Sequence, residues 1–177
     1  MSSSRRSFLA GAVTFRLASQ AAAQTIHGRG LAVGFIGSGI RGKQLIDEFM
    51  EVPGVRGIAV ADLYDGCLER AKEQLGASIQ TTKDYRAILD NKEVQAVCIA
   101  TPDHLHERMV LDALDAGKHV YIEKPISWSF AEGERMVAAS AARPKQVLQV
   151  GSQGKTSALT AKAREVVASG RLGKLNM

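Results

Sequence analysis

Residues 31–42 read LAVGFIGSGIRG, an apolar stretch that runs directly into a turn containing three glycines. These glycines have the G-x-G-x-x-G spacing of a turn that joins a strand to a helix and receives a diphosphate. The first permits the tight turn, the second lets a diphosphate approach the backbone, and the third lets the helix pack on the strand. The N–H groups and the dipole of the helix N-terminus would then bind the anion. The residues predicted to form this site are Gly37, Ser38, Gly39, Ile40, Arg41 and Gly42.

The motif alone is weak, because 17 glycines in 177 residues produce chance matches and glycines also occur in ordinary loops. A second apolar run, GIAVA at residues 57–61, strengthens it because it ends at Asp62, 20 residues after Gly42. A carboxylate at that place accepts hydrogen bonds from the adenosine ribose and repels a 2′-phosphate, so Asp62 favours NAD over NADP. Two alternatives stay open. Asp62 could be a helix cap or a solvated loop acid, and Arg41 or Lys43 could accept the phosphate of NADP.

Apolar runs of strand length alternate with segments of helical period, a pattern typical of a parallel sheet with crossover helices. The predicted strands cover residues 31–36, 57–61, 78–81, 96–101, 119–123 and 146–150, and the predicted helices cover 41–51, 65–75, 84–90, 104–116, 129–142 and 157–169. The sequence therefore predicts an α/β fold with a doubly wound parallel sheet of the Rossmann type. Ligands of such sheets bind beyond the carboxyl ends of the strands. This rule places Asp62, Thr101, Pro102, Glu123 and Lys124 in one cluster with the glycine turn.

Some helix boundaries carry their own signals. Gly76 and Gly117 follow helical segments and are predicted to terminate them, because glycine tolerates the left-handed conformation of a helix end. Ser129 and Glu132 have the spacing of a capping box and predict the start of the helix that follows.

Composition favours one principal domain, because 177 residues that are 45% hydrophobic can bury a substantial core. The formal net charge is +5, but without Arg5, Arg6 and Arg16 of the N-terminal leader there remain 20 basic and 18 acidic residues, or +2. That balance gives no reason to expect nucleic acid as a partner. Neither the two cysteines nor the histidines have the spacing of metal ligands, so no metal site is predicted.

The first 23 residues resemble a twin-arginine export signal. The pair Arg5-Arg6 precedes a moderately apolar stretch, and residues 21–23 offer a cleavage site of the A-x-A type. Arg16 interrupts this stretch, which is too short to span a bilayer. We therefore expect an exported, periplasmic protein with a signal peptide at 1–23, a linker at 24–30 and no membrane anchor in the mature form. The alternative is a disordered leader on a cytoplasmic protein.

Two further segments carry a family resemblance: residues 100–106 read ATPDHLH and residues 116–125 read AGKHVYIEKP. The combination of T-P-x-x-x-H with A-G-K-H-V-x-x-E-K-P, after a dinucleotide fingerprint, resembles the Gfo/Idh/MocA oxidoreductases, which include glucose-fructose oxidoreductase and inositol dehydrogenase. The resemblance extends from about residue 31 to the end of the chain. It implies an NAD(P)-dependent enzyme that acts on a sugar or polyol, with NAD as the expected cofactor and NADP as the alternative.

The resemblance also implies roles for individual residues. Glu123 and Lys124 would lie close to the nicotinamide ribose and the reacting carbon, Thr101 and Pro102 along the nicotinamide side, and His106 would support the start of the following helix. Beyond the glycine turn, the cofactor-binding residues expected are Asp62, Thr101, Pro102, His106, Glu123, Lys124 and Gln153.

Lys124 is the predicted catalytic residue. An ammonium group beside a reacting hydroxyl stabilises the negative charge that develops on oxygen, and a desolvated lysine also loses its proton more readily. The alternative for Lys124 is a structural ion pair with Glu123 or a neighbouring acid.

The expected domain organisation is a dinucleotide-binding domain at 31–151, followed at 152–177 by the beginning of a second, α+β substrate domain. The segment 151–153 resembles the family's passage from one domain to the other. In the family, the acid/base partners of the reaction, typically an Asp and a His, lie in that second domain. We therefore expect a truncated chain, whose homo-oligomer contacts would lie in the missing C-terminal domain.

Three functions follow from these expectations. The first is hydride transfer between a sugar-type or polyol hydroxyl and nicotinamide, with Lys124 polarising or deprotonating the hydroxyl. The second is glycoside hydrolysis assisted by transient oxidation of the sugar with tightly held NAD, known in a branch of the family. The third is a nucleotide-binding module without turnover.

Overall fold

Six strands form one sheet in the order β3-β2-β1-β4-β5-β6, and every neighbouring pair is parallel. The structure is a computed structural model that describes residues 30–173. The strand order reverses between β1 and β4, as in a doubly wound sheet, so the predicted fold class is confirmed. The strands are β1 (Leu31–Ile36), β2 (Val55–Ala61), β3 (Gln80–Thr82), β4 (Ala96–Ile99), β5 (His119–Ile122) and β6 (Leu148–Val150).

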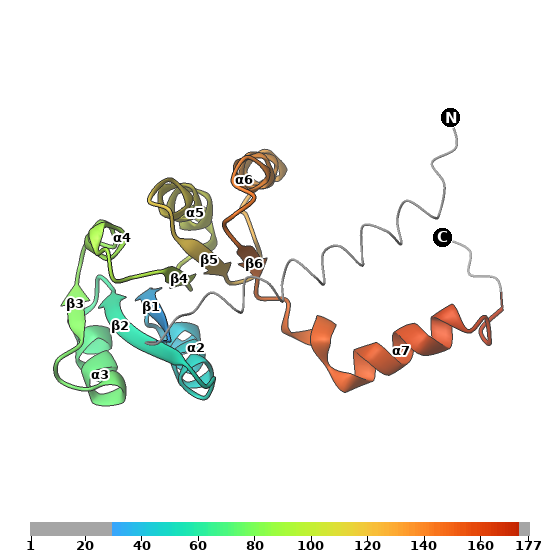
Figure 1. Ribbon diagram of the computed structural model, residues 1–177, viewed down its shortest axis with the longest axis horizontal. Coiled ribbons are helices and arrows are strands. Elements are labelled where there is room, and N and C mark those ends of the chain that lie inside the picture. The colour runs from blue at the N-terminus through green and yellow to red at the C-terminus, as the bar shows by residue number, and fades with distance from the viewer. Residues whose placement is uncertain (1–29, 174–177) are drawn as a thin grey trace.

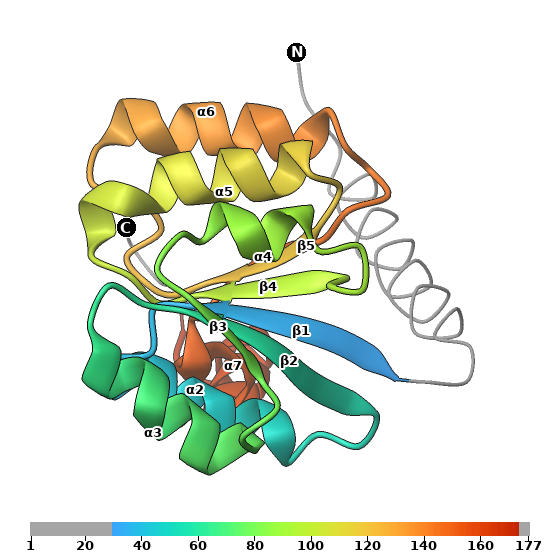
Figure 2. The ribbon, with the colours of Figure 1, turned by 90° about the vertical axis from the view of Figure 1, so that its left-hand side faces the viewer.

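Helices cover both faces of the sheet (Figure 1). On one face lie α2 (Ile40–Met50) and α3 (Asp65–Leu75), and on the other lie α4 (Arg86–Asp90), α5 (His106–Asp115) and α6 (Phe130–Ala141). Figure 2 shows α4, α5 and α6 stacked above the strands, with α2 and α3 below them. The buried residues of α2, α3 and α5 are spaced three or four apart, as expected for an apolar stripe on one helix face.

The core is divided by the sheet into two clusters of buried side chains. Phe35 of β1 packs with Leu45 and Ile46 of α2, whereas its neighbour Ile36 points to the opposite face and packs in the cluster that includes Met109 of α5. Successive side chains of a strand alternate between faces, so β1, covered on both sides, reads as a continuous apolar run. Cys67 and Cys98 are both free and buried.

The predicted elements all occur, with boundaries that differ by a few residues. β4 ends at Ile99 rather than at residue 101, because Pro102 lacks an N–H group for the ladder. The first turn expected in the helix at 104–116 is a 3-10 helix, η1 (Asp103–Leu105), and the α-helix begins at His106. The capping box of Ser129 and Glu132 is present. Gly76 and Gly117 have φ of 102° and 80° and end α3 and α5 as predicted.

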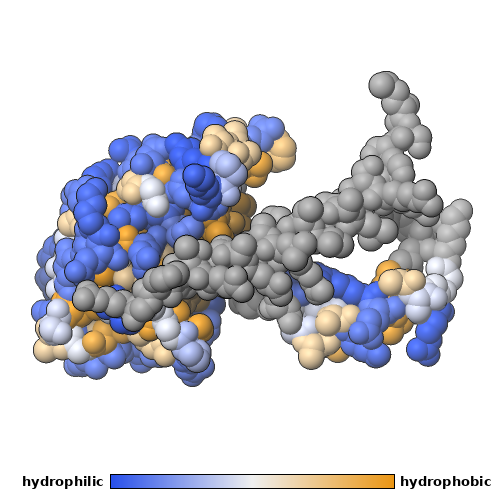
Figure 3. All heavy atoms as spheres, viewed as in Figure 1, coloured by the Kyte–Doolittle hydropathy of each residue, from blue (hydrophilic) through white to orange (hydrophobic). Residues whose placement is uncertain are grey.

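The chain continues past β6 through η2 (Gln153–Thr156) into α7 (Ala158–Ala168), within the predicted 157–169. This helix stands away from the sheet and has no buried residue. Its exposed apolar side chains include Leu159 and Val167, and Figure 3 shows hydrophobic residues along its surface.

The expected signal peptide at 1–23 and all but the last residue of the expected linker at 24–30 lie outside the described residues, as do residues 174–177. Within the described part, no helix has the length and apolar character needed to cross a membrane.

Candidate functional site

The glycine turn lies between the carboxyl end of β1 and the first turn of α2. Gly37 has φ of 85°, in the region that favours glycine, and a Cβ at Gly42 would lie 2.1 Å from the Gly37 carbonyl oxygen. Around Gly39, by contrast, a Cβ would meet nothing within 4 Å. The N-cap of α2 makes no side-chain hydrogen bond, and its first turn holds no acidic residue. Two glycines therefore shape the turn, while the third leaves space in front of a helix N-terminus that is suited to an anion.

Asp62 follows β2 and is bound to the glycine turn. Its Oδ2 atom accepts hydrogen bonds from the Ser38 amide at 2.8 Å and the Ser38 hydroxyl at 3.3 Å, and Oδ1 accepts from the Tyr64 amide at 3.0 Å. The carboxylate is thus fixed at the edge where the adenosine ribose of a dinucleotide would lie. A carboxylate oxygen can accept more than one hydrogen bond, so this position leaves acceptor capacity for ribose hydroxyls.

A cavity of about 620 Å³ opens beside the turn, at the carboxyl ends of β1, β2 and β4. We call it the adenosine-side cavity. Its lining is largely apolar, with Asp62 at its edge and residues of the β3–α4 loop on the far wall. The lining residues are Ile36, Gly37, Gly39, Ala61, Asp62, Leu63, Lys83, Asp84, Tyr85, Arg86, Ala100, Thr101, Pro102, Leu105 and Met109.

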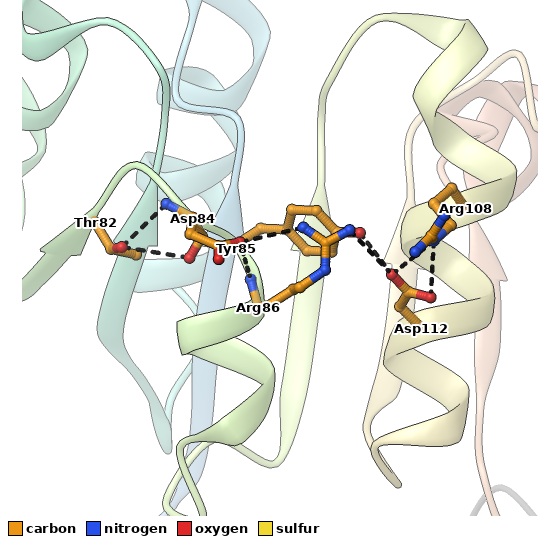
Figure 4. Close-up of polar contacts among 6 residues, drawn as sticks. All are labelled: Thr82, Asp84, Tyr85, Arg86, Arg108 and Asp112. Atoms are coloured by element: carbon orange, nitrogen blue, oxygen red, sulfur yellow. Dashed lines mark hydrogen bonds and ion pairs between the residues drawn. The ribbon is translucent and has the colours of Figure 1, made fainter.

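The β3–α4 wall of this cavity is held to α5 by a polar network (Figure 4). The Tyr85 hydroxyl donates to Asp112 at 2.6 Å, and Arg108 holds the same carboxylate at 3.0 Å. Arg86 lies over the Tyr85 ring, 4.6 Å from its centroid. Burial and the hydrogen bond to Asp112 raise the pKa of the Tyr85 phenol above its ordinary value. Tyr85 therefore stays protonated at neutral pH and anchors this wall.

A second cavity, of about 370 Å³, lies beyond β4 and β5 and shares Ala100 and Thr101 with the first. We call it the lysine-side cavity. Its lining is mostly charged or polar and consists of Arg41, Gln44, Ala100, Thr101, Asp103, Glu123 and Lys124. The structure thus brings a residue of the glycine turn and the predicted catalytic lysine to one cavity, although they are far apart in sequence.

Arg41 and Glu123 form the ion pair at the base of the lysine-side cavity. The Nε atom of Arg41 donates to Glu123 Oε1 at 2.7 Å, and Nη1 contacts Glu48, two turns further along α2, at 3.0 Å. Burial lowers the pKa of the Arg41 guanidinium, but the hydrogen bonds to Glu123 and Glu48 outweigh it, and the net shift is upward. Arg41 is therefore directed at Glu123, and not at the Asp62 edge where the 2′-phosphate of NADP would lie.

Glu123 is buried, and Lys124 is exposed. The second oxygen of Glu123, Oε2, accepts the backbone N–H of Lys124 at 3.0 Å. Among the residues that the structure describes, the ion pair of Glu123 is with Arg41. Lys124 lines the lysine-side cavity, and the Lys124–Pro125 peptide bond is cis.

His106 is buried between the two loops that carry the predicted site. Its Nδ1 atom lies 2.8 Å from the Pro125 carbonyl oxygen, and Nε2 lies 2.9 Å from the Thr101 carbonyl oxygen. His106 is also the first residue of α5. The buried His106 ring therefore connects the loop that contains Thr101 to the loop that contains Pro125.

The remaining predicted residues fall at the same edge of the sheet. Ser38 is buried behind the turn, Ile40 is exposed at the start of α2, and Gln153 begins η2 beyond β6. Sequence reasoning missed the Tyr85–Asp112 contact and the direction of the Arg41 side chain. Only the fold reveals them, because 27 and 82 residues separate the partners.

A doubly wound sheet with an open glycine turn, a fixed acid after β2 and a pair of adjoining cavities defines a dinucleotide-binding α/β domain. The model of the Gfo/Idh/MocA oxidoreductase family, NAD-binding Rossmann fold, matches residues 31–152. This chain belongs to that family.

Curated relatives include two kinds of enzyme. The chain is 26% identical over 145 residues to an inositol 2-dehydrogenase of Salmonella paratyphi B, a match that covers 81% of this chain and 43% of the relative. It is 31% identical over 113 residues to a glycosyl hydrolase family 109 protein of Shewanella sp. strain ANA-3, covering 59% of this chain and 25% of the relative. The chain therefore spans less than half the length of these relatives.

A solved structure gives the same fold. The myo-inositol dehydrogenase of Lactobacillus casei, in complex with NAD(H) and myo-inositol, is 27% identical and superimposes with a TM-score of 0.76. The match covers 81% of this chain and 43% of that protein.

Proposed function

We propose that this chain is the NAD-binding part of an oxidoreductase that acts on a hydroxyl or carbonyl group of a sugar or polyol. Bound NAD would supply the hydride acceptor or donor. The observation that carries the proposal is the meeting of the glycine turn and Lys124 at one edge of the sheet, through the Arg41–Glu123 pair. The dehydrogenase relatives support the substrate class.

The residues divide the work of binding between them. The open space at Gly39 and the free N–H groups of the first turn of α2 receive the diphosphate. Asp62 accepts the ribose hydroxyls and disfavours a 2′-phosphate. The apolar lining of the adenosine-side cavity removes the adenine ring from water. Thr101 and Pro102 line the passage towards the lysine-side cavity.

Lys124 is the residue that we assign to the reacting group. Its ammonium lies at the lysine-side cavity, where it donates a hydrogen bond to the substrate oxygen and stabilises negative charge on it. Lysine Nζ can hold or release a proton at this point. Asp103 and Gln44 of the same cavity offer further hydrogen-bonding groups to a polyhydroxylated substrate.

Titration of the chain with NAD and NADP, followed by assays with inositols and free sugars, tests the proposal. We expect NAD to bind more tightly than NADP, and net NADH to accumulate with a polyol or sugar where the chain supports turnover. Absence of NAD binding would overturn the proposal.

The glycosyl hydrolase relative favours a second candidate function, hydrolysis assisted by reversible oxidation of the sugar. Release of an aryl leaving group from a glycoside without accumulation of NADH would select it over the dehydrogenase. NAD binding with neither reaction would select a binding module without turnover.

We also propose that the protein is exported through its twin-arginine-type leader. Export is tested by fractionating cells that express the chain with Arg5 and Arg6 intact or both replaced by Lys. The double replacement is expected to retain the protein in the cytoplasm. Equal export of both forms would contradict the proposal.

A further inference from the structure

We propose that Arg41 is a positioning residue that sets the place of Lys124 through Glu123, and so connects the glycine turn to the reacting end of the cofactor site. This inference rests on the proposed function. It concerns a side chain of the glycine turn whose backbone belongs to the diphosphate site.

The first link joins the glycine turn to the end of β5. Arg41 lies in the first turn of α2, and its Nε atom reaches Glu123 Oε1 at 2.7 Å. The side chain of Glu123 is only 6% exposed. A buried carboxylate is costly unless it is paired and hydrogen-bonded, and Arg41 supplies the opposite charge and the hydrogen bond for Glu123 in this place.

The second link joins Glu123 to the backbone of Lys124. Glu123 Oε2 accepts the Lys124 N–H at 3.0 Å, while the Glu123 N–H donates to the Ile99 carbonyl of β4 at 3.0 Å. One carboxylate therefore holds Arg41 with one oxygen and the backbone of the next residue with the other. If the Arg41 contact is lost, the carboxylate loses its compensating charge, and the direction in which Lys124 leaves the sheet is no longer fixed.

The guanidinium itself is fixed on its exposed side. Nη1 contacts Glu48 at 3.0 Å and Gln44 at 3.3 Å, both on α2. Arg41 thus has partners on its own helix and on β5. The planar, forked guanidinium can make the contacts to α2 and to Glu123 at the same time, whereas a lysine ammonium is a point charge on a flexible side chain.

This arrangement predicts which ligands will lose affinity when Arg41 is replaced. ADP contains the adenosine and the diphosphate but lacks the second ribose and the nicotinamide. NAD contains all of these parts, so only NAD reaches Lys124. If Arg41 acts by placing Lys124, its loss should weaken NAD binding much more than ADP binding.

The experiment is a double-mutant cycle on binding, with Arg41→Gln, Lys124→Ala and the double variant. Affinities for ADP and NAD are measured by isothermal titration calorimetry on the full 177-residue chain. We expect Arg41→Gln to weaken NAD binding at least fivefold and ADP binding less than twofold. In the Lys124→Ala background, we expect Arg41→Gln to have no further effect on the ratio of the two affinities.

Two further variants secure the test. Glu48→Gln removes the exposed partner of Arg41 and leaves the Glu123 contact, so both affinities should stay within twofold of the original protein. Arg41→Lys keeps the charge and protects against loss of folding, and it should reproduce the selective loss of NAD affinity in milder form. Thermal unfolding of each variant confirms that it is folded.

The inference is overturned if the ratio of NAD to ADP affinity stays within twofold of its original value in both Arg41 variants. It is also overturned if Arg41→Gln lowers this ratio equally with and without Lys124. Should the original protein bind neither ADP nor NAD, the proposed function fails, and this inference fails with it. The first two results would leave the proposed function intact.

Discussion

The adenosine-side and lysine-side cavities lie next to each other and share Ala100 and Thr101, yet they are built in opposite ways. The first is shaped mainly by backbone and apolar side chains around glycines. The second is shaped by charged side chains, above all Arg41, Glu123 and Lys124. Binding a flat, partly apolar group such as adenine requires a concave apolar surface from which water is excluded. Placing a group that transfers a proton requires charged side chains in fixed positions. We therefore expect the two cavities to respond differently to substitution.

The largest effect should come from the turn that both cavities depend on. In Gly42→Ala, the new Cβ would lie 2.1 Å from the Gly37 carbonyl oxygen, and backbone at that distance cannot give way cheaply. We expect a loss of about 3 kcal/mol or more in the free energy of unfolding, together with loss of ADP and NAD binding. Urea unfolding and calorimetric titration measure the two effects.

Gly39→Ala is the matched control for this prediction. Nothing lies within 4 Å of the new Cβ, so the free energy of unfolding should change by less than about 0.5 kcal/mol. ADP affinity should nevertheless fall at least tenfold, because the methyl group would occupy the space assigned to the diphosphate. A Gly42→Ala protein as stable as the original would contradict the role given to the close turn.

The next largest effect should come from His106, which joins the loops of the two cavities. His106→Leu removes the imidazole that lies between the Thr101 and Pro125 carbonyl oxygens, and with it the hydrogen bond that the ring N–H donates to one of them. We expect the free energy of unfolding to fall by about 2 kcal/mol, and affinity for NAD to fall with it. His104→Leu, at an exposed position two residues away, is the control and should change stability by less than about 0.5 kcal/mol. Equal stability of the two variants would exclude the bridging role.

Asp62→Asn should affect the adenosine-side cavity alone. An amide oxygen can still accept the Ser38 N–H and so retain the turn, while the exposed Tyr64 N–H loses its acceptor and the negative charge that opposes a 2′-phosphate is removed. We expect the ratio of NAD to NADP affinity to fall about tenfold, a change of about 1.4 kcal/mol. Asp90→Asn, at the exposed end of α4, removes the same charge elsewhere and should leave the ratio unchanged. An unchanged ratio in Asp62→Asn would show that Asp62 does not select the cofactor.

The two cavities also differ in how much of them the sequence predicts. The adenosine-side cavity follows from local signals, because the spacing of Gly37, Gly39 and Gly42 and the strand that ends at Asp62 are contiguous patterns. The strands and helices are also predicted from local patterns, because the hydrophobic periodicity of a segment indicates a strand or a helix. Only the ends of these elements depend on contacts with other elements. The end of β4 shows the limit of this reasoning, because the strand ends at Ile99, two residues before the predicted end at residue 101.

The lysine-side cavity could be predicted only through a family resemblance. The motif containing Glu123 and Lys124 indicated which residues matter, but no local pattern indicates that Arg41 would cross to Glu123, 82 residues away. The sequence alone is equally compatible with Arg41 binding a phosphate group and with Glu123 forming an ion pair with Lys124. The sheet order resolves this, since it places β1 and β5 on either side of β4.

The smallest effect should come from a contact behind both cavities. Arg135 on α6 forms an ion pair with Glu107 on α5, and the hydrogen bond from Arg135 holds the pKa of Glu107 below its ordinary value. A carboxylate with a lowered folded pKa stabilises the protein above its unfolded pKa of about 4.3, and this contribution is lost as pH falls through the folded pKa.

Glu107→Gln should therefore reduce stability near pH 7 by less than about 1 kcal/mol, as expected for a pair with one exposed partner. The difference from the original protein should shrink as pH falls below the unfolded pKa of about 4.3 and disappear once pH has passed the lower, folded pKa, since the original carboxylate is then protonated as well. Unfolding midpoints measured from pH 3 to pH 7 test this, with Glu134→Gln on the exposed side of α6 as the control. Affinities for ADP and NAD should not change, because Glu107 lines neither cavity. If they do change, α5 and α6 influence the site at long range, and the difference between the two cavities cannot be assigned to the residues that line them.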